Sequence, residues 1–200
     1  RTRTEELLKR PAKREGIKTP SAVQYVARAG HIKKYYGTYR ILKVILSYDY
    51  LWINLRVKGG AYGCMSGFKR NGESFLVSYR DPHLKRTLEV YQGVPDYIRA
   101  FEADEREMTK YIIGTISNKD VPRTPQMQGS ISKTAYFSNV TEDMLQKERN
   151  QILGAQKEDI QKLAALVEAV LSDNQICVVG SETAIEKAED VFMEVKPLIG

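Results

Sequence analysis

An Asn-Gly pair at positions 71–72 is the feature that most restricts how this chain can fold. It separates two segments, about 61–70 and 73–80, in which strand-forming residues recur. A two-residue loop of this composition favours a type I′ turn, because both central residues of that turn need a positive φ. The sequence therefore predicts a β-hairpin across residues 61–80.

A two-residue loop would also fix which residues face each other across the hairpin. Counting from the turn predicts the pairs Arg70–Glu73, Phe68–Phe75, Ser66–Val77 and Cys64–Tyr79. Side chains alternate between the two faces of a strand. We therefore expect Tyr62 on the same face as Cys64 and Phe68, at the end of the strand remote from the turn.

The rest of the chain contains further strand-like and helix-like patterns. The expected strands are 22–29, ended by Gly30, and 176–179. The first expected helix runs from Thr38 to about Leu55, with apolar positions from Ile41 to Tyr48, and the second runs from Pro82 through Tyr91. Three more are expected after Asp104, which forms a capping pattern with Glu107, between Pro125 and Phe137, and after a cap at Asn139 or Thr141. The last two are indicated by an apolar stripe from Ile160 to Leu171 and by the segment from Gly180 through Ala188. This order predicts an α+β domain with a mainly antiparallel sheet and helices packed on one face.

The formal net charge of +6 is concentrated near the start of the chain. Residues 1–20 contain seven Lys/Arg and three Asp/Glu, a net charge of +4, and the other 180 residues carry +2. We interpret residues 1–19 as a basic linker from a missing upstream domain and residues 20–200 as one domain. Because the chain begins with Arg1 rather than Met, we expect it to be a piece of a longer polypeptide, called the parent polypeptide below.

Residues that hold catalytic metals are scarce in this sequence. His31 and His83 are the only histidines, and neither has an acid at metal-ligand spacing. Cys64 and Cys177 each lie in an apolar, strand-like run, which favours buried free thiols. The glycine-rich run 59–67 lacks the Gly-Lys-Ser/Thr ending of a P-loop and precedes a strand rather than a helix. The sequence therefore predicts neither a complete zinc site nor a nucleotide site in this chain.

Several segments, in order, resemble one protein family. The R-x-x-G-G-A-Y-G segment in the C-terminal half of presequence proteases, in the pitrilysin/insulinase superfamily, is similar to Arg56-Val57-Lys58-Gly59-Gly60-Ala61-Tyr62-Gly63. The resemblance continues through residues 78–88 and 93–97, and it includes the early strand at 23–26. Together these segments extend over most of residues 20–200. A single glycine-rich segment would be a weak signal, whereas this ordered set is specific.

This resemblance implies a zinc metalloendopeptidase whose two halves close around unstructured peptides. In that family the first half holds zinc through an inverted His-x-x-Glu-His motif and a distal Glu, and the motif Glu is the general base. Arg56 and Tyr62 match the Arg and Tyr that the last domain contributes to catalysis. Gly59, Gly60 and Ala61 would let the substrate backbone approach. The resemblance further implies that zinc and base belong to an absent N-terminal half, that this chain is inactive alone, and that the enzyme acts in a bacterial cytoplasm or a mitochondrial matrix.

The residues that follow the hairpin have a second possible role. Tyr79, Arg80 and Asp81 belong to the resembling segment 78–88 and could support the site. We favour a structural Arg–Asp pairing over that role.

Two other functions stay open from the sequence. The same fold also builds non-catalytic structural subunits, although the presence of both Arg56 and Tyr62 argues against that function. A basic nucleic-acid-binding module is the third possibility. It is disfavoured because phosphate binding needs several cations on one surface, whereas the excess cations here lie within residues 1–20. We also expect no membrane partner, because no run of about 20 apolar residues occurs.

Overall fold

The structure is a computed structural model that describes residues 13–198. Its strands form one sheet in the order β3-β4-β2-β5-β1-β6. The strands are β1 (Arg14–Thr19), β2 (Gln24–His31), β3 (Gly63–Phe68), β4 (Glu73–Asp81), β5 (Gln175–Ser181) and β6 (Glu194–Pro197). Neighbours from β3 to β5 in this order are antiparallel, whereas β1 runs parallel to both β5 and β6. The predicted α+β class is confirmed, and the sheet is mixed rather than purely antiparallel.

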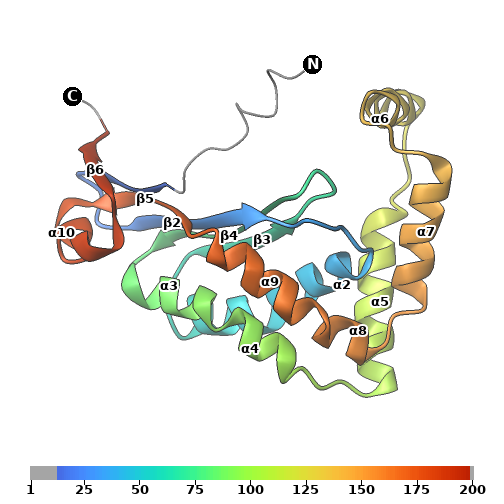
Figure 1. The fold of residues 1–200 in the computed structure, drawn as a ribbon, viewed down its shortest axis with the longest axis horizontal. Coiled ribbons are helices and arrows are strands. Elements are labelled where there is room, and N and C mark those ends of the chain that lie inside the picture. The colour runs from blue at the N-terminus through green and yellow to red at the C-terminus, as the bar shows by residue number, and fades with distance from the viewer. Residues whose placement is uncertain (1–12, 199–200) are drawn as a thin grey trace.

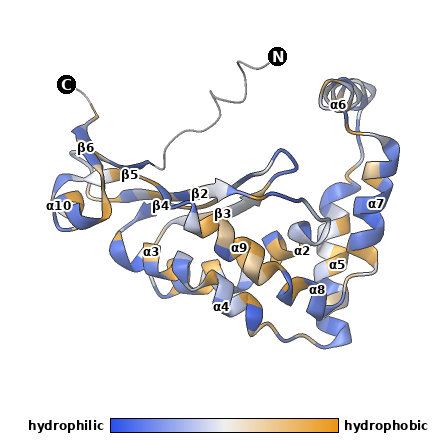
Figure 2. Cartoon of the chain, viewed as in Figure 1, coloured by the Kyte–Doolittle hydropathy of each residue, from blue (hydrophilic) through white to orange (hydrophobic). Residues whose placement is uncertain are grey.

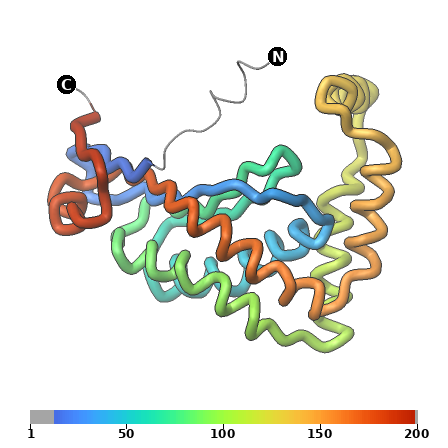
Figure 3. Tube along the Cα trace, in the orientation of Figure 1, coloured from blue at the N-terminus to red at the C-terminus, as the bar shows by residue number. Residues whose placement is uncertain are grey.

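Most helices lie on one face of the sheet (Figure 1). They are α2 (Thr38–Ile45), the π-helical segments η1 (Leu46–Tyr50) and η2 (Trp52–Val57), α3 (Lys85–Gln92), α4 (Val94–Arg99), α5 (Glu105–Lys119), α6 (Pro125–Phe137), α7 (Glu142–Leu153), α8 (Lys157–Gln161), α9 (Leu163–Ser172), α10 (Glu182–Glu186) and the 3-10 turn η3 (Glu189–Val191). Figure 2 shows α9 as a largely hydrophobic helix, and it packs against β2. Helices α5 and α7 lie side by side at one end (Figure 3). No helix within residues 13–198 is long and apolar enough to cross a membrane.

The predicted helix caps are confirmed. Asp104 and Glu107 form a reciprocal capping box, with N–H···O distances of 2.8 and 3.0 Å. Thr141, rather than Asn139, caps α7, and Asn139 instead follows α6 with a left-handed φ of 51°. Ser181 caps α10. Hydroxyl and carboxylate caps satisfy the free N–H groups of a first turn through local bonds, so sequence patterns can reveal them.

Part of the expected linker is a strand. Residues Arg14–Thr19 form β1, which lies between β5 and β6, and residues 1–12 of the expected linker lie outside the described residues. Two charged side chains of β1 form ion pairs with other elements: Lys18 Nζ lies 2.7 Å from Glu186 of α10, and Glu15 lies 3.1 Å from Lys196 Nζ of β6. Lys18 is therefore engaged by an acid of the same domain.

The predicted hairpin is confirmed, but its register is wrong by one residue. The Lys69 N–H donates to the Glu73 carbonyl (2.8 Å), and the Gly72 N–H donates to the Lys69 carbonyl (3.0 Å), so the loop has three residues. Gly72 has a φ of 95°, whereas Asn71 does not have a positive φ. The turn is therefore type I followed by a left-handed glycine rather than type I′. As a result Cys64 faces Ser78 instead of Tyr79.

The register decides what surrounds Tyr62. Tyr79 pairs with Gly63, so its ring lies on the sheet face opposite the side chain of Cys64, which packs against the core. Tyr62 precedes β3, and its ring centroid lies 5.8 Å from that of Tyr79. The prediction that Tyr62 follows Cys64 on the same face is therefore wrong, because strand alternation does not extend beyond the end of β3.

The helix predicted from Thr38 to Leu55 is present but widens into π-helix after Ile45. Leu46, Leu51 and Leu55 are fully buried, at spacings of five and four residues. Tyr48, expected among the apolar positions, is 69% exposed. Along these wide turns Leu51 lies in the core and Arg56 is exposed. Insertions of this kind are frequent at functional sites.

Candidate functional site

A tight reversal of the backbone brings Arg56 and Tyr62 together. After η2 the Gly60 N–H donates to the Arg56 carbonyl (3.0 Å) and the Ala61 N–H donates to the Leu55 carbonyl (2.9 Å). This ending resembles a Schellman motif in which each bond is one residue longer, in keeping with the wide turn before it. Gly60 occupies the left-handed position with a φ of 77°. The chain then enters β3 immediately after Tyr62.

Replacing Gly60 by Ala should destabilise the domain by about 1–2 kcal/mol, the cost of a left-handed backbone for a residue with a Cβ. The added Cβ meets only Pro82, at 3.7 Å, so the effect would come from the backbone rather than from a clash. The matched control is Gly129→Ala in α6, where nothing lies within 4 Å of the added Cβ and alanine is the better helix former. Urea unfolding of both variants tests this prediction, and equal stabilities would contradict it.

The Arg56 guanidinium is held by its immediate neighbours. It donates to the carbonyl oxygen of Tyr62, and its Cζ lies 4.5 Å from the centroid of the Trp52 ring and 5.6 Å from that of Tyr62. Trp52 stands one helical turn before Arg56 and is 41% exposed. Trp52 is not among the predicted site residues, although its spacing of four residues from Arg56 on a helix indicates such a contact. These contacts orient the planar cation while leaving it exposed to solvent.

Tyr62 is 58% exposed, and its ring lies close to the side chains of Tyr79, Arg56 and Arg80. Beside the Tyr79 ring, the Arg80 guanidinium carbon lies 5.6 Å from the Tyr62 centroid. The hydroxyl of Tyr62 forms no hydrogen bond with any other described residue, so the phenol can donate one to a group that approaches it.

Arg80 was expected to belong to a structural pair with an acid such as Asp81, and that expectation is wrong. Asp81 is 1% exposed and accepts hydrogen bonds from the Thr87 hydroxyl (2.7 Å) and the His83 N–H (2.9 Å). Arg80 itself has a left-handed φ of 49°, which is uncommon outside Gly and Asn. This backbone directs its cation to Tyr62. Strained residues of this kind cluster at functional sites.

The three residues expected to contact substrate differ in exposure. Gly59 is buried, and a Cβ added to it would lie 2.5 Å from the Leu55 carbonyl oxygen. Ala61 is 3% exposed and belongs to the hydrophobic core. Gly60 is exposed, so it alone of the three offers its backbone to an incoming chain. Gly59 and Ala61 set the shape of the reversal.

Acidic, cysteine and histidine side chains do not gather into a metal centre in the part of the chain that the structure describes. His31 is exposed at the end of β2, and His83 is half-buried after β4. Both cysteines are free thiols. Burial raises the pKa of Cys64, with Arg56 opposing and Asp81 adding to the shift, and burial likewise raises the pKa of Cys177.

A family model described as the PreP C-terminal domain matches residues 14–182. The chain belongs to this family. Among its curated relatives, Protein HypA of Clostridium perfringens is 47% identical over 191 residues, which cover 94% of this chain and 20% of that protein. Presequence protease 1, chloroplastic/mitochondrial, of Arabidopsis thaliana is 33% identical over 194 residues, which cover 93% and 18%. As a PreP C-terminal domain, the chain therefore spans about a fifth of the length of these relatives.

Solved structures show the same fold for this PreP C-terminal domain. A peptidase M16 inactive domain from Pseudomonas fluorescens superimposes with a TM-score of 0.63 and 17% identity, over 95% of this chain and 44% of that one. Pitrilysin superimposes with a TM-score of 0.54 and 17% identity, over 84% and 19%. At these identities the likeness establishes the fold, and function has to be argued from the site.

Proposed function

We propose that this PreP C-terminal domain is part of a zinc metalloendopeptidase that degrades unstructured peptides, and that it supplies Arg56 and Tyr62 to the reaction. One observation carries the proposal: an exposed phenol without a hydrogen-bond partner among the described residues stands beside an exposed guanidinium, and both are held by packing. A domain with only a structural role does not need an exposed hydroxyl and an exposed guanidinium side by side. The membership of the chain in the family supports the same assignment.

Each residue has a distinct task in the proposed mechanism. When a peptide bond is attacked by water, negative charge develops on the carbonyl oxygen. The Tyr62 hydroxyl would donate a hydrogen bond to that oxygen, and the bond would strengthen as the charge grows. Arg56 would bind the same oxygen or a neighbouring substrate carbonyl with its planar fork of donors. Arg80 and Tyr79 would hold the Tyr62 ring in place, and Gly60 would let the substrate backbone approach.

The zinc and the general base would lie in another part of the parent polypeptide, where bound zinc supplies the activated water. The described residues of this chain have no cluster of ligands that fits a zinc ion. Tyr62 and Arg56 fit the role of transition-state donors instead of ligands. We propose that the parent polypeptide works in a bacterial cytoplasm or a mitochondrial matrix.

The isolated chain should neither bind stoichiometric zinc nor cleave peptides. Metal analysis of the purified chain and a fluorogenic peptide assay test this prediction, with the parent polypeptide as the positive control. One tightly bound zinc per 200-residue chain, or turnover above the buffer blank, would contradict it. A parent polypeptide that binds no zinc and cleaves no peptide would instead favour the non-catalytic alternative.

A further inference from the structure

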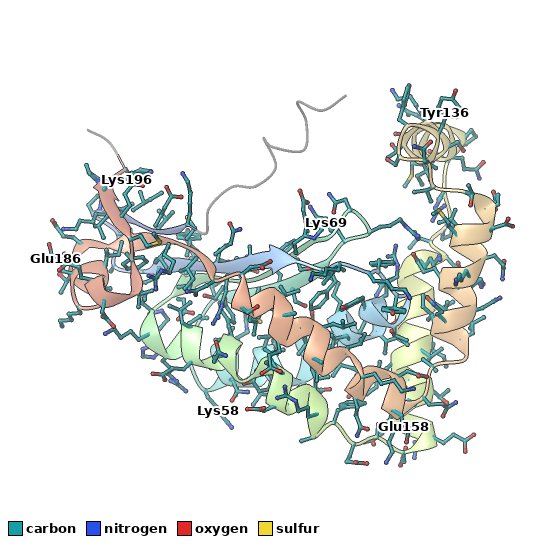
Figure 4. The ribbon with its side chains drawn as sticks, in the orientation of Figure 1. Lys58, Lys69, Tyr136, Glu158, Glu186 and Lys196 are labelled. Carbon is teal, nitrogen blue, oxygen red and sulfur yellow. The ribbon has the colours of Figure 1, made fainter. Side chains whose placement is uncertain are left out.

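Helix α6 packs on almost nothing in the described chain. Of its residues Pro125–Phe137, only Ala135 is even half-buried, and the others are exposed. The helix stands at the end of the molecule remote from α10 (Figures 1 and 3). Figure 4 shows Tyr136 on this outlying helix, where its side chain is 78% exposed.

The surface of α6 combines apolar with uncharged polar side chains, and Lys133 is the one charged residue among Pro125–Phe137. Met127 and Ile131, four residues apart, lie on one side of the helix and are 47% and 41% exposed. Tyr136 and Phe137 form an edge-to-face pair with centroids 5.5 Å apart at the C-terminal end. Beside this pair is a hollow that Ala135, Asn139 and Val140 help to line. The hollow offers room for a side chain from a partner.

Charge is depleted along the same stretch. Residues 121–141 contain no Asp or Glu and only two cations, Arg123 and Lys133, in a chain with 28% charged residues. Loss of charge together with Met and aromatic residues is the composition of an interface centre. A helix of 13 residues without tertiary packing is also only marginally stable in water. Both facts indicate that α6 is covered in the assembled protein.

We propose that α6 docks on the part of the parent polypeptide that lies upstream of this chain. About four fifths of the relatives' length lies outside the matched region. A single exposed helix is too small to hold a second copy, because a stable dimer buries about 800 Å² on each partner. A partner in the same polypeptide is already present at a high effective concentration, so a small contact suffices. The inference rests on the proposed function only in that this chain is one part of a longer protein.

Photo-cross-linking in the parent polypeptide tests where α6 docks. A benzoylphenylalanine in place of Tyr136 should cross-link to a peptide that precedes Arg1 within the same molecule, as mapped by mass spectrometry. The control carries the probe at Tyr48, which is 69% exposed on a different helix. A cross-linked dimer, or a yield no higher than at Tyr48, would overturn the proposal. The reaction needs no catalytic activity, so a failure of the Tyr62 mechanism would leave this result unchanged.

Hydrogen exchange of the parent polypeptide gives a second, independent measurement. Ile131→Asp should speed amide exchange within α6 by about ten-fold or more, because the variant loses the covering contact and local opening becomes easier. Ser132→Asp is the matched control, since Ser132 is exposed on the same helix, lies on a different side from Ile131, and the substitution introduces the same charge into α6. Equal exchange of α6 in the two variants would contradict the docking of this surface.

Discussion

Tyr62→Phe in the parent polypeptide is expected to lower kcat by about 10²–10³-fold, the usual loss for one donor to a developing oxyanion. The variant keeps the ring, so its contacts with Tyr79 and Arg80 should persist. Only the hydroxyl, which forms no hydrogen bond with another described residue, is removed. Steady-state kinetics with a fluorogenic peptide measure kcat and KM separately, and KM should change much less than kcat.

The control for this prediction is Tyr48→Phe, which removes another exposed tyrosine hydroxyl, in η1. Its kcat should match that of the parent. Equal turnover by Tyr62→Phe and the parent would eliminate the oxyanion role. A rise in KM at constant kcat would show that Tyr62 binds the ground state and the transition state equally well.

The second large effect concerns a buried carboxylate far from this site. The Glu148 side chain on α7 is 2% exposed, and its oxygens contact Arg40 (2.6 Å), Lys119 (3.0 Å) and Arg70. These cations come from α2, α5 and the hairpin loop. Glu148 therefore joins α7 to three other parts of the fold through one side chain.

Glu148→Gln should destabilise the domain by about 3 kcal/mol, at the lower end of the loss for breaking a buried ion pair, because the cations keep some solvent. The amide preserves the shape but leaves three cations without a counter-charge. Thermal and urea unfolding measure the change. The control is Glu89→Gln on α3, an exposed acid for which we expect a change within about 0.5 kcal/mol. If the two variants were equally stable, the ion pairs of Glu148 would contribute nothing to the free energy of unfolding.

The same carboxylate predicts a pH dependence. Burial raises the pKa of Glu148, but Arg40, Lys119 and Arg70 together outweigh it and leave the pKa below the ordinary value. A lowered pKa in the folded state means that the stabilisation is complete above the pKa of the unfolded chain, about 4.3, and is lost as the pH falls through the folded value. The difference in unfolding free energy between the unsubstituted domain and Glu148→Gln should therefore shrink below about pH 4. A constant difference down to pH 3 would contradict this assignment.

The sequence by itself determined the local features of the domain and its family. Helix caps at Asp104, Thr141 and Ser181 are set by side chains within three residues of the backbone groups they bind, so their patterns are legible without a fold. The apolar stripe from Ile160 to Leu171 was correct for the same reason. The segment around Arg56 and Tyr62 identified the family, which the match to residues 14–182 confirms.

Tertiary structure decided what depends on distant partners. β1 looked like a polar linker because the strands that pair with it, β5 and β6, come from the other end of the chain. The hairpin slipped by one residue from the prediction, since packing of alternate side chains, and not the Asn-Gly pair alone, fixes a register. The wide turn before Arg56 places Leu51 in the core, and the left-handed Arg80 brings its cation within 5.6 Å of the Tyr62 centroid; neither is visible in the local sequence. Local bonds can be read from neighbouring residues, whereas register, helical widening and side-chain direction are set by surfaces that meet only when the chain has folded.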